Sequence, residues 1–268
     1  MTAIPPILLV GCGRMGGAML AGWRERGLAP SIAVDPAPEA ARMAGPDLTV
    51  LGDASVIPAD FSPAAVVLAV KPQSAAEALP PHARHAGHAV FLSIMAGRTI
   101  GGIRGLLGSG AAVVRAMPNT PAAVRQGVTV ACAGPGVRDA QRALCESLLQ
   151  AIGVVAWADD EALLDPVTAV SGSGPAYVFL LAELMEQAAV EQGIPPDLAR
   201  LLARQTVAGS GALLAASAED AAALRRAVTS PGGTTAEALK VLMASDAWPA
   251  AMRRAIAEAT RRSRELAG

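Results

Sequence analysis

The sequence is poor in aromatic residues, cysteine and lysine, and each shortage narrows the kind of protein that it encodes. Only 3% of its 268 residues are aromatic, whereas 52% are hydrophobic and many of these are alanine, which favours helix-rich packing. The three cysteines, Cys12, Cys132 and Cys145, are scattered and form no CxxC pair, so neither a disulfide framework nor a zinc site is expected. Lysine occurs only at Lys71 and Lys240.

An excess of charge and a membrane-type segment are also missing. The net charge is −1, so nothing indicates nucleic acid or an anionic membrane surface as a partner. No basic leader precedes the first apolar stretch, residues 4–10, which is too short for a signal peptide. No uninterrupted apolar run is long enough to span a bilayer. We therefore expect a soluble, cytoplasmic protein of one large domain or two ordinary ones.

The chain opens with a strand pattern followed by a glycine-rich turn. Ile7–Val10 is a continuous apolar run, typical of a strand buried on both faces of a parallel sheet. Gly11-Cys12-Gly13-Arg14-Met15-Gly16 follows it as GxGxxG, before a helical pattern over residues 15–26. In this context the motif predicts a dinucleotide site: the glycines allow a tight turn, approach of a pyrophosphate, and packing of the helix on the strand. A merely structural glycine turn is the less favoured alternative.

Strands and helices alternate up to about residue 160. Further strands are expected at 32–34, 65–70, 89–94, 112–117, 128–131 and 154–157, with a helix at 137–151. This alternation predicts a doubly wound α/β sheet, a Rossmann domain over residues 1–160. Ligands bind beyond the C-terminal strand ends of such sheets, where Val70, Lys71, Pro72 and Asn119 fall. We expect these residues to contact the cofactor, and both the donor and the acceptor of the Asn119 side chain could bind a carboxamide. The alternative for Lys71 is a surface salt bridge, and the alternative for Asn119 is an Asn-Thr-Pro turn.

An acidic residue, Asp35, ends the second predicted strand. A carboxylate at this position normally accepts hydrogen bonds from the adenosine ribose hydroxyls. The following residues, Pro36-Ala37-Pro38, offer no cation for a 2′-phosphate, which favours NADH over NADPH. Because Arg14 or Arg42 could reach such a phosphate, the preference stays open and the cofactor is given as NADH or NADPH.

Beyond residue 160 no strand pattern remains, and residues 161–268 are expected to form an all-helical domain. Its helices are expected at 175–192, 196–215, 218–227, 234–243 and 248–266. The first of these has Pro175 in its first turn and Ser173 or Gly174 as its cap. It is apolar nearly all round, with Glu183 and Glu186 as exceptions, which predicts burial in a homodimer interface. An intramolecular core helix is the alternative.

A second glycine-rich turn, Ser230-Pro231-Gly232-Gly233-Thr234-Thr235, lies in this helical half. Thr234 and Glu237 have the spacing of a capping box, so a helix is expected to begin at Thr234. The free N–H groups of such a helix start suit an anion, for example a carboxylate. A plain glycine turn before a helix explains the pattern equally well.

The only histidines, His82, His85 and His88, fall in one stretch that is interrupted by glycine. A solvated loop is the preferred interpretation, and no metal site is predicted. None of the three follows a predicted strand, so no imidazole is placed for the proton transfer of a histidine-based hydroxy-acid dehydrogenase.

Together these motifs resemble the Δ1-pyrroline-5-carboxylate reductase family, in the family's order and over nearly the whole chain. The matching stretches are Gly11-x-Gly13-x-Met15-Gly16, Ala69-Val70-Lys71-Pro72-Gln73, Met117-Pro118-Asn119-Thr120-Pro121, Ser171-Gly172-Ser173-Gly174-Pro175-Ala176-Tyr177, and Val228-Thr229-Ser230-Pro231-Gly232-Gly233-Thr234-Thr235. The last two are highly specific, whereas the first is shared with many dehydrogenases. Asp165-Pro166 and Asp35-Pro36 depart from the usual pattern, and the second departure bears on cofactor preference.

The resemblance implies that NAD(P)H reduces the cyclic imine (S)-1-pyrroline-5-carboxylate to L-proline, the last step of proline biosynthesis. It also implies dimers that assemble into decamers, with the active site between the cofactor and a partner subunit's helices. The substrate carboxylate is expected on Ser230, Gly232, Gly233, Thr234 and Thr235. Thr235, whose hydroxyl would meet the ring nitrogen, and Lys71 are the expected catalytic residues; Lys71 and Asn119 would line the nicotinamide pocket.

Two other protein classes share some of these features. A β-hydroxy-acid dehydrogenase shares the GxGxMG start, but the helix expected to carry its lysine and asparagine, residues 174–191, contains neither. A non-catalytic dinucleotide sensor would need no intact substrate loop.

Overall fold

The computed structural model describes residues 3–267, which divide into two units. One unit comprises the described residues up to Gly172 together with those from Ala259 on, and the other is Ser173–Glu258. The end of the chain therefore returns to the unit in which it began. The domain boundary expected after residue 160 stays a prediction.

The first unit is built on one sheet of eight strands in the order β3-β2-β1-β4-β5-β6-β7-β8. The strands are β1 Ile7–Val10, β2 Ser31–Val34, β3 Leu48–Leu51, β4 Ala65–Leu68, β5 Val90–Ser93, β6 Ala112–Met117, β7 Gly127–Ala133 and β8 Gly153–Trp157. All neighbours run parallel except β6 and β7. The connection of residues 118–126 explains the reversal, because a parallel crossover needs a dozen residues or more.

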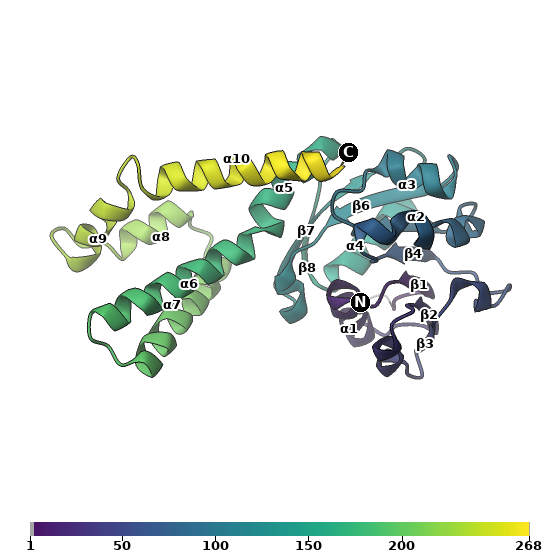
Figure 1. Ribbon diagram of the computed structural model, residues 1–268, viewed down its shortest axis with the longest axis horizontal. Coiled ribbons are helices and arrows are strands. Elements are labelled where there is room, and N and C mark those ends of the chain that lie inside the picture. Colours follow the sequence, from purple (N-terminus) through teal and green to yellow (C-terminus); the bar gives the residue numbers. More distant parts are fainter. Residues whose placement is uncertain (1–2, 268) are drawn as a thin grey trace. The chain divides into compact units, whose positions relative to one another are not determined.

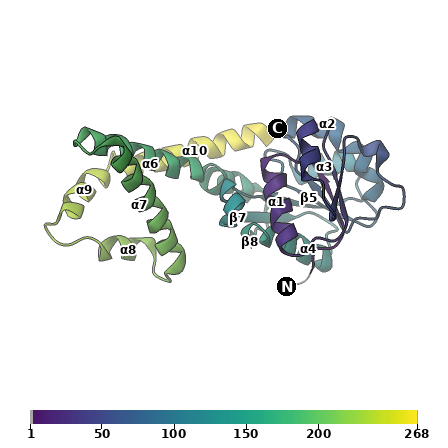
Figure 2. The same cartoon turned by 90° about the horizontal axis from the view of Figure 1, so that it is seen from below.

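Helices cover both faces of this sheet, as expected for a doubly wound fold (Figure 1). Helices α1 (Arg14–Glu25) and α4 (Asp139–Gln150) lie on one face, and α2 (Ala75–Ala78) and α3 (Ile100–Leu107) on the other (Figure 2). Alternate residues of β1 feed the two cores: Ile7 and Leu9 pack on the α1 side, Leu8 and Val10 on the α3 side. Trp23 of α1 is fully buried and its indole N–H donates to the Leu148 carbonyl at 2.9 Å. The short connections are α5 (Leu164–Val167), a π-helical turn (Thr168–Gly172) and the 3-10 turns Pro38–Met43, Ala54–Val56, Pro72–Ser74, Pro80–His85, Thr120–Val124 and Glu161–Leu163.

The second unit is helical, as predicted. It contains α6 (Gly174–Glu191), α7 (Pro196–Ala216), α8 (Ala221–Ala227), α9 (Thr234–Leu242) and the start of α10 (Trp248–Ala267). Helices α6 and α7 pack along each other (Figure 1). Pro175 lies in the first turn of α6, and Ser173 occupies the cap position without a capping hydrogen bond from its side chain.

The apolar surface of α6 is exposed within a single chain. No residue of α6 is buried, and Phe179 and Leu184 are 66% and 50% exposed. By length and composition alone, the helical run Glu161–Glu191 could cross a membrane, with a mean hydropathy of 1.3 and 6% of its apolar window buried. Asp165, Glu183 and Glu186 interrupt this segment, so it is not an uninterrupted apolar run of the kind that the sequence lacks. An exposed apolar helix of this kind needs a covering surface, which a second copy of the chain could provide.

The interpretation of the histidine stretch as a solvated loop is wrong for two of its three members. His82 and His85 lie in the 3-10 turn Pro80–His85 and are only 1% and 2% exposed, whereas His88 is exposed. The two prolines that begin this turn direct the chain back onto the α3 side of the sheet. Burial lowers the pKa of both buried imidazoles to about 4, assisted for His82 by His85 and for His85 by Arg84.

Candidate functional site

The three motif glycines have the geometry that a dinucleotide loop requires. Gly11 has φ 98°, and a Cβ on it would lie 2.8 Å from the backbone of Ala69, at the end of β4. A Cβ on Gly16 would lie 2.4 Å from the Gly11 carbonyl oxygen, so only glycine lets α1 pack this closely on the turn. At Gly13 a Cβ would meet nothing within 4 Å, which leaves open space in front of the turn.

The start of α1 is suited to an anion. Gly13 is the N-cap, no side chain caps this end, and the first turn carries no acidic residue. The first backbone N–H groups of a helix lack intrahelical acceptors and carry a partial positive charge. Gly13 and Arg14 are exposed, Met15 is half-buried and Cys12 is buried, so a phosphate could approach from the Gly13 side.

Asp35 lies beside this loop. It is the first residue after β2, and its carboxylate accepts hydrogen bonds from the Cys12 N–H at 2.6 Å and from the Ala37 N–H at 2.9 Å. Burial, together with the Asp35 carboxylate, raises the pKa of the Cys12 thiol to about 11. Cys12 is therefore neutral near pH 7, and its backbone takes part in the loop geometry.

The strand ends bring the other predicted cofactor residues to the same edge. Strands β1 to β6 are parallel, so Val70, Lys71 and Pro72 after β4 and Asn119 after β6 lie at the edge that carries the glycine loop. Lys71 is exposed and, among the described residues, has no ion-pair partner. The alternative interpretation, a surface salt bridge, is therefore not observed among the described residues.

Asn119 is already anchored on one side. Its Oδ1 accepts the Val128 N–H at 3.0 Å, and the residue is 8% exposed. This bond to the start of β7 uses one of the two lone pairs of the amide oxygen, so the expectation that both the donor and the acceptor serve a carboxamide stays a prediction. The side-chain NH2 group remains for a ligand.

One loop at this edge received no role from the sequence. After β5 the chain turns at Ala96-Gly97, where Gly97 has φ 69° and a Cβ would lie 2.9 Å from the Leu266 carbonyl oxygen. The last turn of α10 therefore packs against the loop that follows β5, within the first unit. A glycine a few residues after a buried strand was the available signal.

The turn at Ser230 lies in the second unit. The Gly233 N–H donates to the Ser230 carbonyl at 3.0 Å and Gly232 has φ 71°, which together form a proline-glycine turn. Helix α9 begins at Thr234, as predicted, but its N-cap is Gly233. The predicted capping box is wrong: Thr234 is already inside the helix, and Glu237 pairs with Lys240 at 2.6 Å.

This turn nevertheless presents backbone donors. The N–H groups of Thr234 and Thr235 have no acceptor among the described residues, and Ser230, Gly232 and Thr234 are exposed. No side chain occupies the N-cap position of α9, so the start of this helix can still receive a carboxylate.

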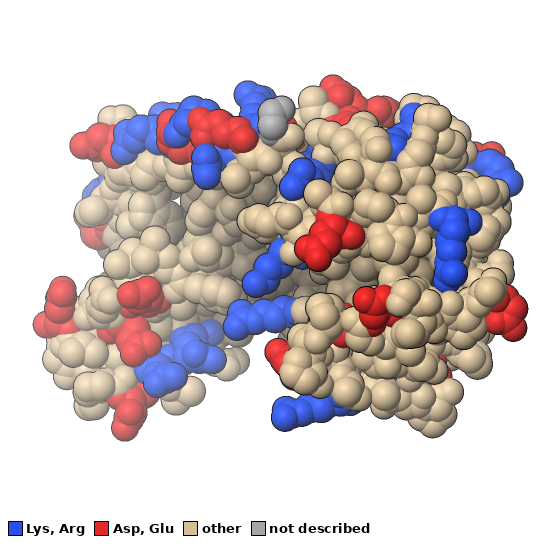
Figure 3. All heavy atoms as spheres, turned by 45° about the vertical axis from the view of Figure 1, so that its right-hand side comes forward, with Lys and Arg blue, Asp and Glu red and all other residues tan. Residues whose placement is uncertain are grey.

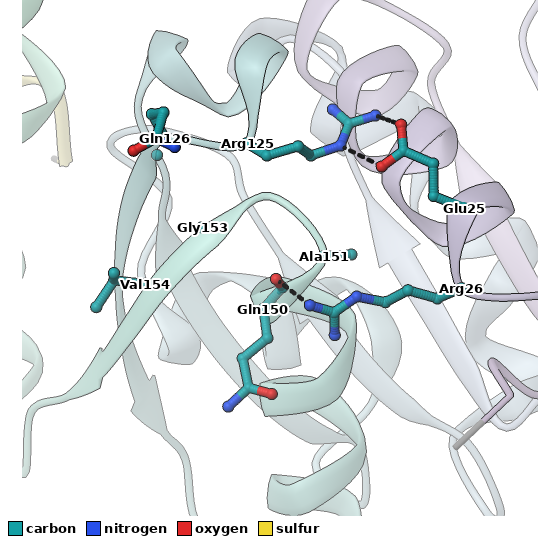
Figure 4. A pocket seen from close by; sticks show the side chains of 9 residues that line it. Glu25, Arg26, Arg125, Gln126, Gln150, Ala151, Gly153 and Val154 are labelled. Atoms are coloured by element: carbon teal, nitrogen blue, oxygen red, sulfur yellow. Dashed lines mark hydrogen bonds and ion pairs between the residues drawn. The ribbon is translucent and has the colours of Figure 1, made fainter. Parts of the chain in front are cut away.

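A hollow in the first unit lies away from the edge of the sheet that carries the glycine loop. It has a volume of about 540 Å³ and lies at the end of α1 opposite Gly13 (Figure 4). Arg125 donates to Glu25 at 2.7 and 2.9 Å, and Arg26 donates to the Gln150 carbonyl at 2.5 Å. Both guanidinium groups of this hollow therefore already have hydrogen-bond partners within the chain.

Among residues 3–267, no group of three or more His, Cys, Asp or Glu is placed to hold a metal ion. On the face shown in Figure 3, basic and acidic side chains are interspersed, consistent with the net charge of −1.

A largely parallel sheet whose first strand leads into GxGxxG, with Asp35 after the second, defines a Rossmann-type dinucleotide oxidoreductase. Residues 161–266 match a family model described as pyrroline-5-carboxylate reductase dimerisation, and residues 6–97 match one described as NADP oxidoreductase, coenzyme F420-dependent. The chain is 39% identical to the pyrroline-5-carboxylate reductase of Pseudomonas aeruginosa, covering 98% of this chain and 97% of that protein. The chain belongs to the pyrroline-5-carboxylate reductase family, as its motifs predicted.

Solved structures agree with this assignment. The structure of a pyrroline-5-carboxylate reductase from Coxiella burnetii matches with a TM-score of 0.90 and 31% identity, covering 98% of each chain. The Plasmodium falciparum enzyme, solved with NADP bound, matches with a TM-score of 0.82 and 26% identity, covering 98% of this chain and 99% of that one. The predicted fold, a Rossmann domain followed by a helical dimerisation domain, is confirmed.

Proposed function

We propose that this chain is an NAD(P)H-dependent reductase that converts (S)-1-pyrroline-5-carboxylate to L-proline, the last step of proline biosynthesis. The observation that carries this proposal is the near full-length similarity to pyrroline-5-carboxylate reductases. The glycine loop and the Ser230 turn supply the two binding functions that such a reaction needs.

The dinucleotide is proposed to bind along the edge of the sheet. Its pyrophosphate would lie on the N–H groups at the start of α1, supported by the open space at Gly13. Asp35 would hold the adenosine ribose, and Val70, Lys71, Pro72 and the NH2 group of Asn119 would contact the nicotinamide end. The loop residues assigned to the cofactor are Gly11, Cys12, Gly13, Arg14, Met15 and Gly16.

The substrate carboxylate is proposed to bind at the start of α9. The free N–H groups of Thr234 and Thr235 and the Ser230 hydroxyl would hold it, the turn at Gly232 and Gly233 would let it approach the backbone closely, and the Thr235 hydroxyl would meet the ring nitrogen. The bound nicotinamide supplies the hydride. Thr235 and Lys71 are the proposed catalytic residues: Thr235 orients the C=N bond, and Lys71 places a positive charge near the nicotinamide end. A protonated imine is already a good hydride acceptor, so orientation is the main task of the protein.

The working form is proposed to be a homodimer, with dimers assembled into a decamer in the cytoplasm. Support for the dimer comes from the match to a dimerisation family over residues 161–266 and from the exposed apolar side chains of α6. Sedimentation velocity should show a dimer or a larger species, and Leu184→Glu should shift it toward monomer. Glu183→Gln, a change on the same helix without added charge, is the matched control. A wild-type monomer at assay concentration would contradict this assembly.

The reaction itself is tested by mixing the purified protein with pyrroline-5-carboxylate and NADH or NADPH. Loss of the reduced nicotinamide absorbance, with proline as product, is the expected result. Pyrroline-2-carboxylate, run in parallel, tests the nearest alternative imine. Binding of the cofactor without oxidation by either imine would favour the rival interpretation, a dinucleotide sensor.

A further inference from the structure

We propose that this chain binds NADH in preference to NADPH and that Asp35 is the residue that makes the distinction. The inference rests on the cofactor half of the proposed function, the dinucleotide site at residues 11–16. It does not depend on which imine is reduced.

The backbone fixes Asp35 next to the glycine loop. Strands β1 and β2 are parallel neighbours with Val10 opposite Val34, and the Gly11 N–H donates to the Val34 carbonyl at 2.9 Å. On its other side, the Asp35 N–H donates to the Leu51 carbonyl at 3.0 Å. Asp35 is therefore held between the first motif glycine and the end of β3.

The carboxylate of Asp35 is also fixed. One oxygen accepts the Cys12 N–H at 2.6 Å and the other accepts the Ala37 N–H at 2.9 Å, so the side chain cannot turn away without losing two hydrogen bonds. A carboxylate can accept about four hydrogen bonds, which leaves capacity for the ribose hydroxyls of NADH. Asp35 is only partly buried, so these lone pairs can be reached.

A 2′-phosphate would meet the same fixed group unfavourably. At neutral pH a phosphate monoester carries a charge of about −1.5 to −2, so it repels the carboxylate and cannot replace the hydroxyl as a full donor. The residues after Asp35 add no cation, and Glu39 brings a second negative charge to the turn that follows.

Arg14 and Arg42 are the cations that could reverse this preference. Both are exposed and, within residues 3–267, have no ion-pair partner, so each would have to be ordered from solvent to hold the phosphate. The carboxylate is already in place and needs no ordering. The repulsion therefore outweighs an attraction that must first immobilise a long side chain.

The test is a binding titration of the purified protein with NADH and with NADPH, followed by the fluorescence of the reduced nicotinamide. We expect the Kd for NADPH to be about tenfold or more above that for NADH, and the ratio to shrink as salt screens the repulsion. Asp35→Asn should bring the two Kd values within about threefold. Because an amide could disturb the Cys12 hydrogen bond, Pro36→Arg provides a second variant: it retains Asp35 and should improve NADPH binding selectively.

Glu39→Gln is the matched control for loss of a carboxylate, since Glu39 is exposed and no hydrogen bond or ion pair fixes it among the described residues, and it should change the ratio far less than Asp35→Asn does. Equal or tighter binding of NADPH by the wild type, lost in Arg14→Ala or Arg42→Ala, would overturn the proposal. So would the failure of NADH to bind. Preferential NADH binding without imine reduction would leave this inference standing and remove the proposed function instead.

Discussion

The buried histidines His82 and His85 should make the first unit unusually sensitive to mild acid. Both imidazoles are neutral in the fold, and Arg84 Nε lies 3.3 Å from His85 Nε2, so a proton added there would face a guanidinium. The Nδ1 atom of His82 has no hydrogen-bond partner, so its charged form would be buried without compensation. Lowering the pH from 7.5 to 5.0 should therefore reduce the free energy of unfolding.

The size of this loss follows from the two pKa values. In the fold both pKa values are about 4, below the ordinary 6.5, so the unfolded chain binds more protons between these limits. The contribution of these two histidines to the free energy of unfolding is fully present above about pH 6.5 and is lost as the pH falls toward 4. At pH 5 the loss is about 2 kcal/mol for each histidine, and about 3 kcal/mol for the pair because repulsion by His85 contributes to the His82 shift.

Urea unfolding followed by circular dichroism, at fixed protein concentration and ionic strength, measures this difference. With a urea dependence of about 2 kcal/mol per molar, the midpoint should fall by roughly 1.5 M between the two pH values. At pH 5 most carboxylates remain ionised in both states, so they contribute little.

Variants identify the groups responsible. The double variant His82→Leu/His85→Gln should lose most of the pH dependence, because neither replacement can be protonated. His88→Gln, at an exposed position in the same stretch, should retain it. A wild-type midpoint that moves by less than about 0.3 M, or a double variant that behaves like the wild type, would refute the reasoning.

Three further changes address the proposed site. Thr235→Ala should lower kcat/KM for the imine by roughly 10- to 100-fold, as expected for one or two lost hydrogen bonds, and unchanged kinetics would remove Thr235 from the mechanism. Gly16→Ala places a Cβ 2.4 Å from the Gly11 carbonyl oxygen, so thermal denaturation should show a lower Tm as well as weaker NADH binding. Gly13→Ala meets nothing within 4 Å in the protein, so it should spare the Tm while weakening NADH binding; an unchanged Kd would place the pyrophosphate elsewhere.

Continuous apolar runs made most of the fold predictable. β1 and β6 were predicted with their observed bounds, because every residue of each run except Arg115 is apolar and the strands are buried. β3 was missed because Leu48–Leu51 has only four residues, is interrupted by the polar Thr49 and has only Leu48 buried, so it resembles a surface segment. The antiparallel direction of β7 depends on the length of a connection, and apolar patterning does not report strand direction.

The glycine loop of the candidate site could be predicted from the sequence, because its backbone conformation requires glycine at fixed positions. Glycines at fixed spacing after a strand identify a turn whatever surrounds it, and the geometry at Gly11 and Gly16 agrees with that prediction. Side-chain hydrogen bonds were less accessible. The sequence could not reveal that Asn119 uses its acceptor on Val128, since their contact depends on the reversed strand β7. Similarly, the burial of the histidines depends on how the Pro80–His85 turn packs, which no local pattern encodes.

If Asn119 lines the nicotinamide pocket as proposed, the hydrogen bond that it accepts from the Val128 N–H also bears on cofactor affinity. A residue that is anchored by the sheet before any ligand arrives loses little rotational freedom when the ligand binds. The same hydrogen bond limits which residues are tolerated at position 119, because replacing Asn119 would leave the Val128 N–H of β7 without its acceptor. The fixed orientation of the Asn119 side chain and its low tolerance of substitution thus have the same cause, which is the chain reversal between β6 and β7.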